Sequence, residues 1–258
     1  MQVLEHGAQV PDPLSPYRAV DRSRPRHECW VMGHMVAGID GTAAIGGRVG
    51  SLSTGSDQSL FRGMRELADI VMVGAETVRL EGYGAVRLPE AARERRRRLG
   101  QPETPPVAVV SRTLEFDWST PVFAQAPDHA PTHLITCSAA DPERRAEAER
   151  HATVITAGQE RVEPAAAMRA LADLGHRVVL CEGGPTWLGG LVAADRLDEL
   201  CLSISPMMGG DPLPVCLTPS GAGTSEFALK GTLVEEDTLF LRYEKDRQES
   251  PLEGPGHA

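Results

Sequence analysis

The sequence predicts an α/β domain with a mainly parallel central sheet, helices on its flanks and an antiparallel hairpin at the C-terminal edge. Short β-rich runs alternate with helical segments through the middle of the chain, an order that is typical of parallel sheets. The last β-rich stretch contains a short acidic turn, which indicates a hairpin. We expect residues 27–246 to form this domain, with a flexible arm at 1–26 and a flexible tail at 247–258, because neither end shows apolar periodicity.

The first half of the domain is predicted from one strong apolar run and from the residue pattern that follows it along the chain. Residues 29–37 are apolar without alternation, which favours a central strand covered on both faces. The glycine-rich stretch 38–55 is interpreted as a loop over a ligand. A helix capped by Asp57 should run to about residue 68, because apolar side chains recur there at helical spacing. A buried strand at 69–74 and a short helical turn at 75–80 should follow.

The second half continues the alternation. Further strands are expected at 107–110, 133–136, 153–156, 177–181 and 200–205. The helix at 164–174 has a proline at its first position and a glycine stop, and it leads directly into a strand, so it should join parallel strands by a right-handed crossover. A second helix is expected at 186–194. The stretch 225–244 is interpreted as the hairpin, with Leu239, Leu241 and Tyr243 on one face.

Composition excludes several classes of protein. The chain has 258 residues, 41% of them hydrophobic and 24% charged, which is ordinary for a globular domain. The formal net charge of −10 argues against a general nucleic-acid binder, because phosphate neutralisation needs a basic surface. No apolar run is long enough to span a membrane, and the N-terminus does not resemble a secretion signal. We therefore expect a cytoplasmic protein without nucleic-acid or membrane partners.

Two sequence features could suggest special sites, and both have plainer explanations. The five cysteines are scattered without a CxxC spacing, and those at 29, 181 and 201 should be small core residues, so no metal site is expected. A run of arginines between residues 93 and 98 favours a solvated helix or loop, with phosphate contact as the lesser alternative.

Two glycine-containing turns between a strand and a helix are the main candidates for a ligand site. Residues 181–186 (CEGGPT) leave a buried strand for a helix, where glycines allow close approach and free N–H groups attract an anion. A pyrophosphate cradle and a plain structural turn both explain this motif, which is not GxGxxG. Residues 73–77 (VGAET) form a second such turn. In a parallel sheet both turns lie at the same edge, so we expect them to converge on a dinucleotide.

Charged side chains flank these turns. Arg65 and Arg87 are either surface arginines or a fork for a phosphate or carboxylate of the substrate. Asp40, Glu81 and Glu182 are the carboxylates nearest the proposed cleft. A carboxylate there can hydrogen-bond a pyrimidine or ribose, or relay a proton, so Glu81 and Asp40 are the candidate catalytic groups. His34 lies in an apolar strand and is expected to be a satisfied core histidine.

Three stretches together resemble the reductase domain of the bacterial riboflavin-biosynthesis deaminase/reductase, the 5-amino-6-(5-phosphoribosylamino)uracil reductase family. They are residues 37–41 (AGIDG), 64–78 (MRELADIVMVGAETV), and 182–186 (EGGPT) continuing to 198–200 (DEL). The resemblance covers roughly residues 28–245. It implies a dihydrofolate-reductase-like fold, a homodimer, and hydride transfer from NADPH to C1′ of a ribosylamino-pyrimidine.

The turns and the resemblance also assign residues to roles. Substrate contacts are expected from Arg65, Arg87 and Glu182. The expected cofactor contacts are Ala37, Gly74, Thr77, Glu81, Ser111, Gly183, Gly184, Pro185, Thr186, Trp187 and Leu188.

This sequence also departs from the family pattern. His34 stands where the family is expected to have a lysine, Glu81 replaces an aspartate, and Gly38 and Ile39 replace a Ser-Leu pair. The zinc-binding motifs of the deaminase half are absent, so any deamination should belong to another protein. These changes keep two alternatives open, which are a reductase of the same fold acting on dihydrofolate, a pterin or a secondary metabolite, and a nucleotide-binding protein without turnover.

Overall fold

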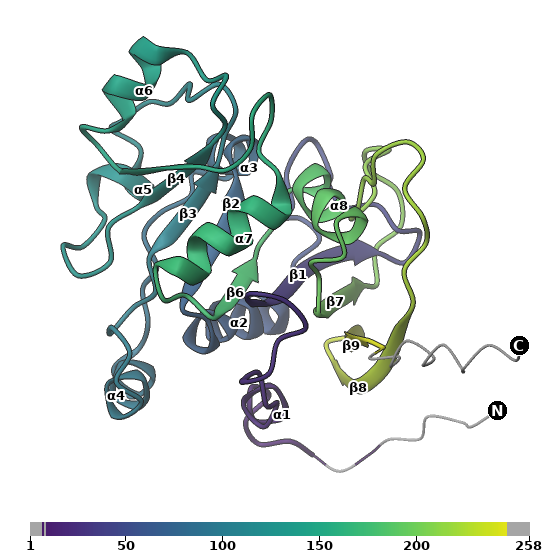
Figure 1. Ribbon diagram of the computed structural model, residues 1–258. Coiled ribbons are helices and arrows are strands. Elements are labelled where there is room, and N and C mark those ends of the chain that lie inside the picture. Colours follow the sequence, from purple (N-terminus) through teal and green to yellow (C-terminus); the bar gives the residue numbers. More distant parts are fainter. Residues whose placement is uncertain (1–6, 8, 247–258) are drawn as a thin grey trace, which may run out of the picture.

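The computed structural model describes residue 7 and residues 9–246, and it is built around one mixed sheet (Figure 1). Within that part of the chain the sheet has nine strands in the order β5-β4-β3-β2-β6-β1-β7-β9-β8. The strands are β1 Trp30–Gly38, β2 Ile70–Gly74, β3 Val107–Val110, β4 His133–Thr136, β5 Thr153–Thr156, β6 Val178–Cys181, β7 Glu199–Ser205, β8 Phe227–Glu235 and β9 Thr238–Lys245. All neighbours from β5 to β7 pair in parallel, and only β9 and β8 join antiparallel. The predicted fold class is confirmed.

Helices cover both faces of the sheet. They are α1 Ser15–Arg18, α2 Gly55–Met64, the 3-10 helix η1 Arg65–Leu67, α3 Ala75–Glu81, α4 Glu90–Arg98, α5 Pro121–Ala124, α6 Pro142–Ala148, α7 Pro164–Asp173 and α8 Pro185–Ala193. One apolar cluster joins the sheet to α2 and α3, with Leu60 and Met64 buried in it. A second cluster on the other face joins the sheet to α7 and α8 through Met168, Leu171 and Leu188. Figure 1 shows α7 and α8 in front of the sheet and α2 behind it.

The central position of β1 follows from its composition. Val31 and Met32 have no solvent exposure, and β1 pairs in parallel with β6 on one side and β7 on the other. The crossover helix α7 does connect parallel strands, but they are not neighbours. It carries the chain from the edge strand β5 to β6, which pairs with β2 and β1. The sequence pattern predicts that such a helix joins parallel strands, but it does not encode how far along the sheet the crossover reaches.

The C-terminal hairpin turns where the sequence predicts it. Glu236 and Asp237 have φ values of 50° and 57°, and they link β8 to β9. Thr238 and Phe240 are buried on one face of β9. Leu239, Leu241 and Tyr243 lie on the other face, as expected, and this face is more open to solvent.

The region that we expected to be a flexible arm, residues 1–26, is packed in its described part. Tyr17 is buried, and the buried guanidinium of Arg22 donates to both carboxylate oxygens of Glu199 at 2.9 Å. A few anchoring side chains hold this segment, and they leave no periodic pattern that sequence analysis could detect. Residues 1–6 and 8, and the expected tail at 247–258, lie outside the described residues.

Two further predictions require correction. Helix α2 is capped by Thr54, whose side chain accepts from the Asp57 backbone N–H at 3.3 Å, so Asp57 lies in the first turn and is not the cap.

The arginine run forms α4, as the plainer interpretation holds, but Arg96 is fully buried. Its Nη1 donates to the carbonyls of Glu66 at 2.9 Å and Ala68 at 2.6 Å, so it ties α4 to the domain. The other arginines of the run pair with glutamates, which leaves no support for phosphate contact.

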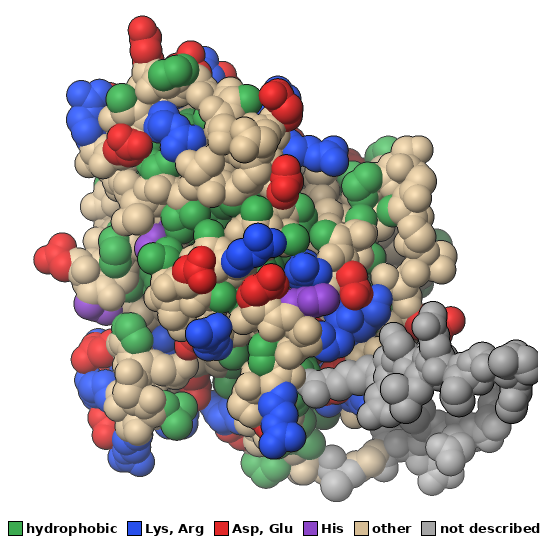
Figure 2. All heavy atoms as spheres, viewed as in Figure 1, with side chains coloured by type: hydrophobic (Ala, Val, Ile, Leu, Met, Phe, Trp, Pro, Cys, Tyr) green, Lys and Arg blue, Asp and Glu red, His purple; other side chains and the backbone are tan. Residues whose placement is uncertain are grey.

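Cys29, Cys181 and Cys201 are buried, as predicted for small core residues. No described helix is both long and apolar enough to cross a membrane. Among residues 7 and 9–246, no group of three or more histidine, cysteine, aspartate or glutamate side chains is arranged to hold a metal ion. On the face in Figure 2, basic and acidic side chains are interspersed.

Candidate active site

A cavity of about 1630 Å³ opens at the C-terminal ends of β1, β2, β3 and β6. This edge of an open parallel sheet is where ligands bind in α/β proteins. A pocket for one small molecule measures roughly 300–1,000 Å³, so this cavity has room for a dinucleotide and a second molecule.

The two sides of the cavity differ in chemistry. We call the side formed by Gly74, Thr77, Ser111, Gly184, Thr186 and Trp187 the glycine wall, and the side formed by His34, Asp57, Phe61, Arg65, Tyr83 and Glu182 the charged wall.

The glycine wall brings the two predicted turns into direct contact. The backbone N–H of Gly74 donates to the carbonyl of Gly183 at 2.9 Å. A Cβ added to Gly74 would lie 3.3 Å from the Gly184 nitrogen, and one added to Gly184 would lie 3.2 Å from Thr77 Oγ1. Both distances are tighter than most Cβ contacts, so a side chain at either position would require its neighbour to shift by a few tenths of an ångström. The two turns meet at one edge of the sheet, as predicted.

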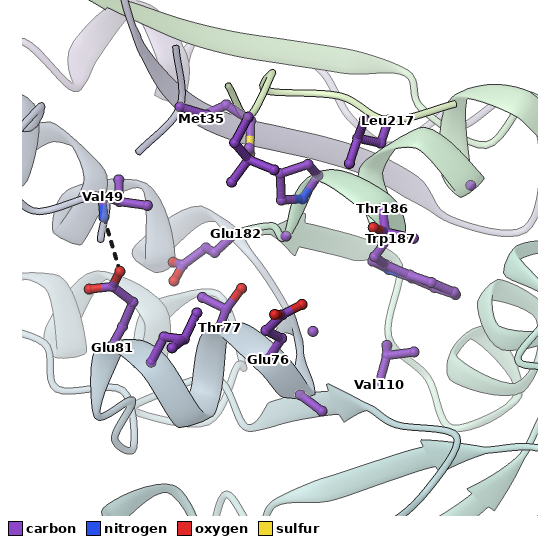
Figure 3. A pocket seen from close by; sticks show the side chains of 18 of the residues that line it. Met35, Val49, Glu76, Thr77, Glu81, Val110, Glu182, Thr186, Trp187 and Leu217 are labelled. Atoms are coloured by element: carbon purple, nitrogen blue, oxygen red, sulfur yellow. Dashed lines mark hydrogen bonds between the residues drawn. The ribbon is translucent and has the colours of Figure 1, made fainter. Parts of the chain in front are cut away.

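The start of α8 presents free backbone donors to the cavity. Gly184 is the N-cap, Pro185 occupies the first turn, and no side chain caps the helix. The first-turn N–H groups of a helix have no partner within the helix and carry a partial positive charge, so they attract an anion. Trp187 is fixed beside them, because its Nε1 donates to Met72 Sδ at 2.8 Å. Figure 3 shows Thr186 and Trp187 across the cavity from Glu81 of α3, with Thr77 between them.

Two arginines that sequence analysis did not single out lie at the rim of the glycine wall. Arg112 follows Ser111 at the end of β3, and Arg161 lies in the segment between β5 and α7. Both side chains are exposed, and neither forms an ion pair within the part of the chain that the structure describes. The rim therefore carries uncompensated positive charge.

The charged wall is organised around a buried ion pair. Arg65 Nε and Nη2 each donate to a different carboxylate oxygen of Glu182, both at 2.7 Å, and the Glu182 side chain has no solvent exposure. Tyr83 OH also donates to Glu182 and accepts from Arg65 Nη2 at 3.1 Å. Burial raises the pKa of Tyr83 well above its usual value, and the charge of Glu182 adds to this, so the phenol keeps its proton. The fork expected of Arg65 is present, but it holds a carboxylate of the protein itself.

His34 is buried, as expected, but it is not satisfied. Its Nε2 has no hydrogen-bond partner among the described residues, and the nearest carboxylate oxygen is Oδ1 of Asp57 at 3.8 Å. Burial lowers the pKa of His34, an effect that the charge of Asp57 partly opposes, so the imidazole is held neutral.

Glu81 is at the rim of the cavity and exposed to solvent. Its Oε1 accepts from the backbone N–H of Val49 at 3.0 Å, so it ties the glycine-rich loop after β1 to α3 (Figure 3). This contact holds the loop over the cavity, in the position that the sequence predicts for it.

The structure does not bring the other predicted residues into the cavity. Asp40 lies in an exposed loop, where Oδ2 accepts from Gly209 N at 2.7 Å and Oδ1 from Thr42 N at 3.1 Å, and these bonds lower its pKa. Arg87 is exposed and donates to Gln125 Oε1 at 3.1 Å. Ala37 and Leu188 are buried and do not line the cavity. Gly183 does not line it either, and its φ of 97° suits glycine.

The segment between β7 and β8 is also part of the site, although its sequence pattern did not predict this. Leu213, Leu217 and residues 219–222 line the cavity. Leu217 N donates to the Pro185 carbonyl at 3.0 Å, and a Cβ on Gly189 would lie only 1.8 Å from the Leu217 carbonyl oxygen. A glycine inside a helix, as at 189 in α8, is a sequence signal that another segment can approach the helix closely.

Comparisons with known proteins agree with this architecture. A 2,5-diamino-6-ribosylamino-4(3H)-pyrimidinone 5′-phosphate reductase from Methanothermobacter thermautotrophicus is 29% identical over 173 residues, which cover 67% of this chain and 75% of the relative. A solved structure of a pyrimidine reductase-like protein from Corynebacterium diphtheriae has a TM-score of 0.80 at 26% identity, and covers 91% of this chain and 98% of that one.

A more distant likeness concerns the fold alone. The RibD structure from Acinetobacter baumannii superposes with a TM-score of 0.66 at 14% identity, over 85% of this chain and 58% of that longer chain. The sequence profile of the family described as the RibD C-terminal domain matches residues 29–237, which is most of the domain that builds the cavity. The chain belongs to the RibD C-terminal domain family.

Proposed function

We propose that the protein is an NADPH-dependent reductase that transfers hydride to C1′ of a ribosylamino-pyrimidine 5′-phosphate. The observation that carries this proposal is the contact between the two glycine turns at the base of a cavity with room for two molecules. Membership of the RibD C-terminal domain family and the activity for which the Methanothermobacter relative is named support the same reaction. Because NADPH is an intracellular cofactor, we expect the reaction to take place in the cytoplasm.

The glycine wall fits a phosphorylated dinucleotide. The uncapped start of α8 suits the pyrophosphate, and the close approach of Gly74 and Gly184 lets the ligand lie against the backbone. Arg112 and Arg161 carry unpaired charge at the rim, which suits the 2′-phosphate that distinguishes NADPH from NADH. Ser111 and Thr77 add hydroxyl groups to the same wall. NADPH supplies the hydride, and the protein supplies alignment and charge.

The charged wall then takes the substrate, with Glu182 and Arg65 forming a fixed ionic surface. In the proposed reaction C1′ accepts the hydride, the bond from C1′ to the ring oxygen breaks, and that oxygen takes a proton. We propose Glu81 as the group that delivers this proton, because among the two carboxylates considered from the sequence it is the one at the cavity rim. Asp40 and Arg87 are not part of the proposal.

A reductase of dihydrofolate or another pterin is the second candidate. One observation favours it, which is the buried carboxylate of Asp57 beside Phe61 in the charged wall, since this pair would also suit the aminopyrimidine ring of a pterin. The two candidates share the cofactor and differ only in the molecule that occupies the charged wall.

Oxidation of NADPH by the purified protein tests the proposal. We expect turnover with a ribosylamino-pyrimidine 5′-phosphate and little or none with dihydrofolate, followed by the loss of absorbance at 340 nm. Glu81→Gln should lower kcat by roughly 10²-fold or more if this carboxylate moves the proton. Glu115→Gln, on an exposed loop, is the control. Absence of both cofactor binding and turnover with every pyrimidine and pterin would contradict the proposal.

We also propose that the protein forms a homodimer through one face of β7, β9 and β8. Cross-strand pairing puts apolar side chains together on this face, and these are Leu200, Leu202, Ile204, Leu229, Val234, Leu239, Leu241 and Tyr243. Leu229, Val234 and Leu239 are 50%, 58% and 40% exposed. A contiguous apolar sheet face of this kind marks an association surface, and a second copy satisfies it by two-fold symmetry.

Light scattering after size-exclusion chromatography checks this interface. The unmodified protein should elute as a dimer, and Val234→Glu should elute as a monomer because a charge would be buried at the interface. Glu235→Gln, next in the strand, serves as the control. A monomeric unmodified protein at micromolar concentration would refute the dimer without affecting the proposed reaction.

A further inference from the structure

The first turn of α2 is not anchored by apolar packing. Further along this helix, Leu60 and Met64 are buried in the core. In the first turn, Gly55 is exposed, Ser56 is half-buried, and only the polar side chain of Asp57 is buried. A helix end without buried apolar side chains opens more readily than one that is packed in the core. Polar contacts must therefore hold this turn in place.

These polar contacts come from the turn between β8 and β9, which lies 180 residues away in the sequence. Oε2 of Glu236 accepts from the backbone N–H of Ser56 at 3.0 Å and from its hydroxyl at 2.9 Å. Thr238, two residues further on, donates its hydroxyl to Oγ1 of the N-cap Thr54 at 3.4 Å. A carboxylate at the start of a helix pairs with a free N–H group and with the positive end of the helix dipole. Glu236 thus ties the hairpin to α2.

The backbone of this turn indicates why a glutamate matters at position 236. Glu235 pairs with Thr238, so Glu236 and Asp237 form a two-residue loop, and their φ values are 50° and 57°. Glycine, asparagine and aspartate adopt this conformation most readily, so a glutamate is less favourable for the turn itself. A residue held in an unfavourable backbone conformation points to a function for its side chain. The side chain of Glu236 reaches α2, which supplies that function.

The part of α2 that Glu236 holds belongs to the charged wall. Asp57, Gln58 and Phe61 line the cavity from the first two turns of this helix. Glu236 and Ser56 do not line it. Glu236 therefore acts on the charged wall through the position of α2, without touching a ligand in the cavity.

We propose that Glu236 is a positioning residue, which holds the first turn of α2 in the place where the substrate meets it. This inference rests on the proposed function, in which the charged wall takes the substrate. Without the carboxylate, the turn occupies this position for only part of the time, and the apparent affinity for the substrate falls by the same fraction. The cofactor lies on the glycine wall and should bind as before.

Glu236→Gly removes the carboxylate and suits the backbone of the turn, so the hairpin should still fold. We expect the KM for a ribosylamino-pyrimidine 5′-phosphate to rise about 10-fold, which corresponds to a helix turn that is in position about a tenth of the time. The kcat and the KM for NADPH should change by less than about 2-fold, because only binding to the charged wall is weakened. A KM for the pyrimidine that also stays within this range would overturn the inference.

Two further variants separate positioning from a general effect on the hairpin. Asp237→Gly makes the same backbone change one residue along, whereas the described contacts of the turn with the start of α2 come from Glu236 and Thr238. It should leave the KM unchanged. Glu236→Gln keeps an acceptor oxygen for the Ser56 N–H and should raise the KM by no more than about 3-fold. The positioning role is refuted if either variant raises the KM as much as Glu236→Gly does.

Hydrogen exchange in the protein without ligands separates this inference from the proposed reaction. The backbone amides of residues 55–58 should exchange about 10-fold faster in Glu236→Gly than in Asp237→Gly, because the turn opens more often. The amides of α8, in the glycine wall, should exchange equally in both variants. If no pyrimidine is reduced, the proposed function fails, and this measurement still decides whether Glu236 holds the turn. Equal exchange at residues 55–58 in the two variants would refute the inference.

Discussion

The two walls of the cavity are built by opposite means. The glycine wall is shaped by backbone, because Gly74 and Gly184 bring two turns into contact and the start of α8 offers main-chain N–H groups. The charged wall is shaped by side chains, through the buried pair of Arg65 and Glu182 and the unpartnered atoms of His34 and Asp57.

This difference teaches how one cavity can treat two ligands differently. Backbone donors and small residues recognise features that every phosphorylated dinucleotide shares, so the glycine wall depends on shape and on rim charge. Buried polar side chains pair with the hydrogen-bond donors and acceptors of one particular ring. The charged wall should therefore set substrate specificity, and single substitutions in it should have large effects. Substitutions in the two walls should therefore have separable effects on stability, cofactor use and substrate use.

The largest expected effect is the loss of the ion pair in the charged wall. Arg65→Met removes the only fork that compensates the fully buried Glu182 side chain within the described structure, so the free energy of unfolding should fall by about 3–5 kcal/mol. Urea denaturation followed by circular dichroism measures this. Arg98→Met, at an exposed arginine of α4, should change stability by less than about 0.5 kcal/mol. If both variants are equally stable, the pair is not a structural element of that wall.

Cofactor choice should depend on the rim of the glycine wall. The double variant Arg112→Gln and Arg161→Gln should raise the KM for NADPH by roughly 10- to 100-fold and leave the KM for NADH unchanged, because charge-assisted contacts to the 2′-phosphate are lost. Steady-state kinetics with both cofactors measures the ratio. Arg62→Gln, which removes a positive charge from the opposite side of the cavity, should leave this ratio unchanged. An equal effect on NADPH and NADH would argue against 2′-phosphate recognition.

A smaller effect is expected where the two turns meet. Gly184 has a φ of −78°, which alanine also adopts without backbone strain. The substitution Gly184→Ala therefore tests only whether there is room for a Cβ between the two turns. Its Cβ would lie 3.2 Å from Thr77 Oγ1 and would displace this side chain of the glycine wall by a few tenths of an ångström, so the Kd for NADPH should rise by about 3- to 10-fold. Gly223→Ala is the control, since nothing lies within 4 Å of its added Cβ. Fluorescence titration with NADPH that gives the same Kd for both variants would show that close approach of the turns is unimportant.

The smallest effect concerns acid stability of the charged wall. Burial lowers the pKa of His34 in the folded protein, so the unfolded state binds a proton more readily, and the stability from neutral His34 is lost as pH falls below about 6.5. The Tm of the unmodified protein should therefore drop more between pH 7 and pH 5 than that of His34→Gln. We expect a difference on the order of 2–4 °C, which about 1 kcal/mol produces in a domain of this size.

Calorimetry at both pH values measures this difference. The other buried histidine with a strongly lowered pKa, His133 at about 4, is present in both proteins, so its contribution cancels in the comparison. A larger drop for the variant would mean that His34 is protonated in the folded protein at neutral pH.

The order of strands and helices was predictable because it depends on local pattern. The apolar run of β1, the proline at the start of α7 and the turn at Glu236 each act over a few residues, and the structure has each of them where the sequence predicts. The two glycine turns were predictable for the same reason, since a strand that passes into a helix through glycine is visible in the sequence alone.

The tertiary structure decided what those elements meet. The contact of Gly74 with Gly183 exists because β2 and β6 are neighbours in the sheet, although they are far apart in the sequence. The sequence alone suggests that Arg65 is free to bind an anion of the substrate, but the fold places Glu182 against it. The sequence also suggests that Asp57 caps α2, but Thr54 is the cap in the structure. Whether a polar side chain is available to a ligand depends on partners distant in sequence, and only packing brings those partners together or leaves an atom unpaired.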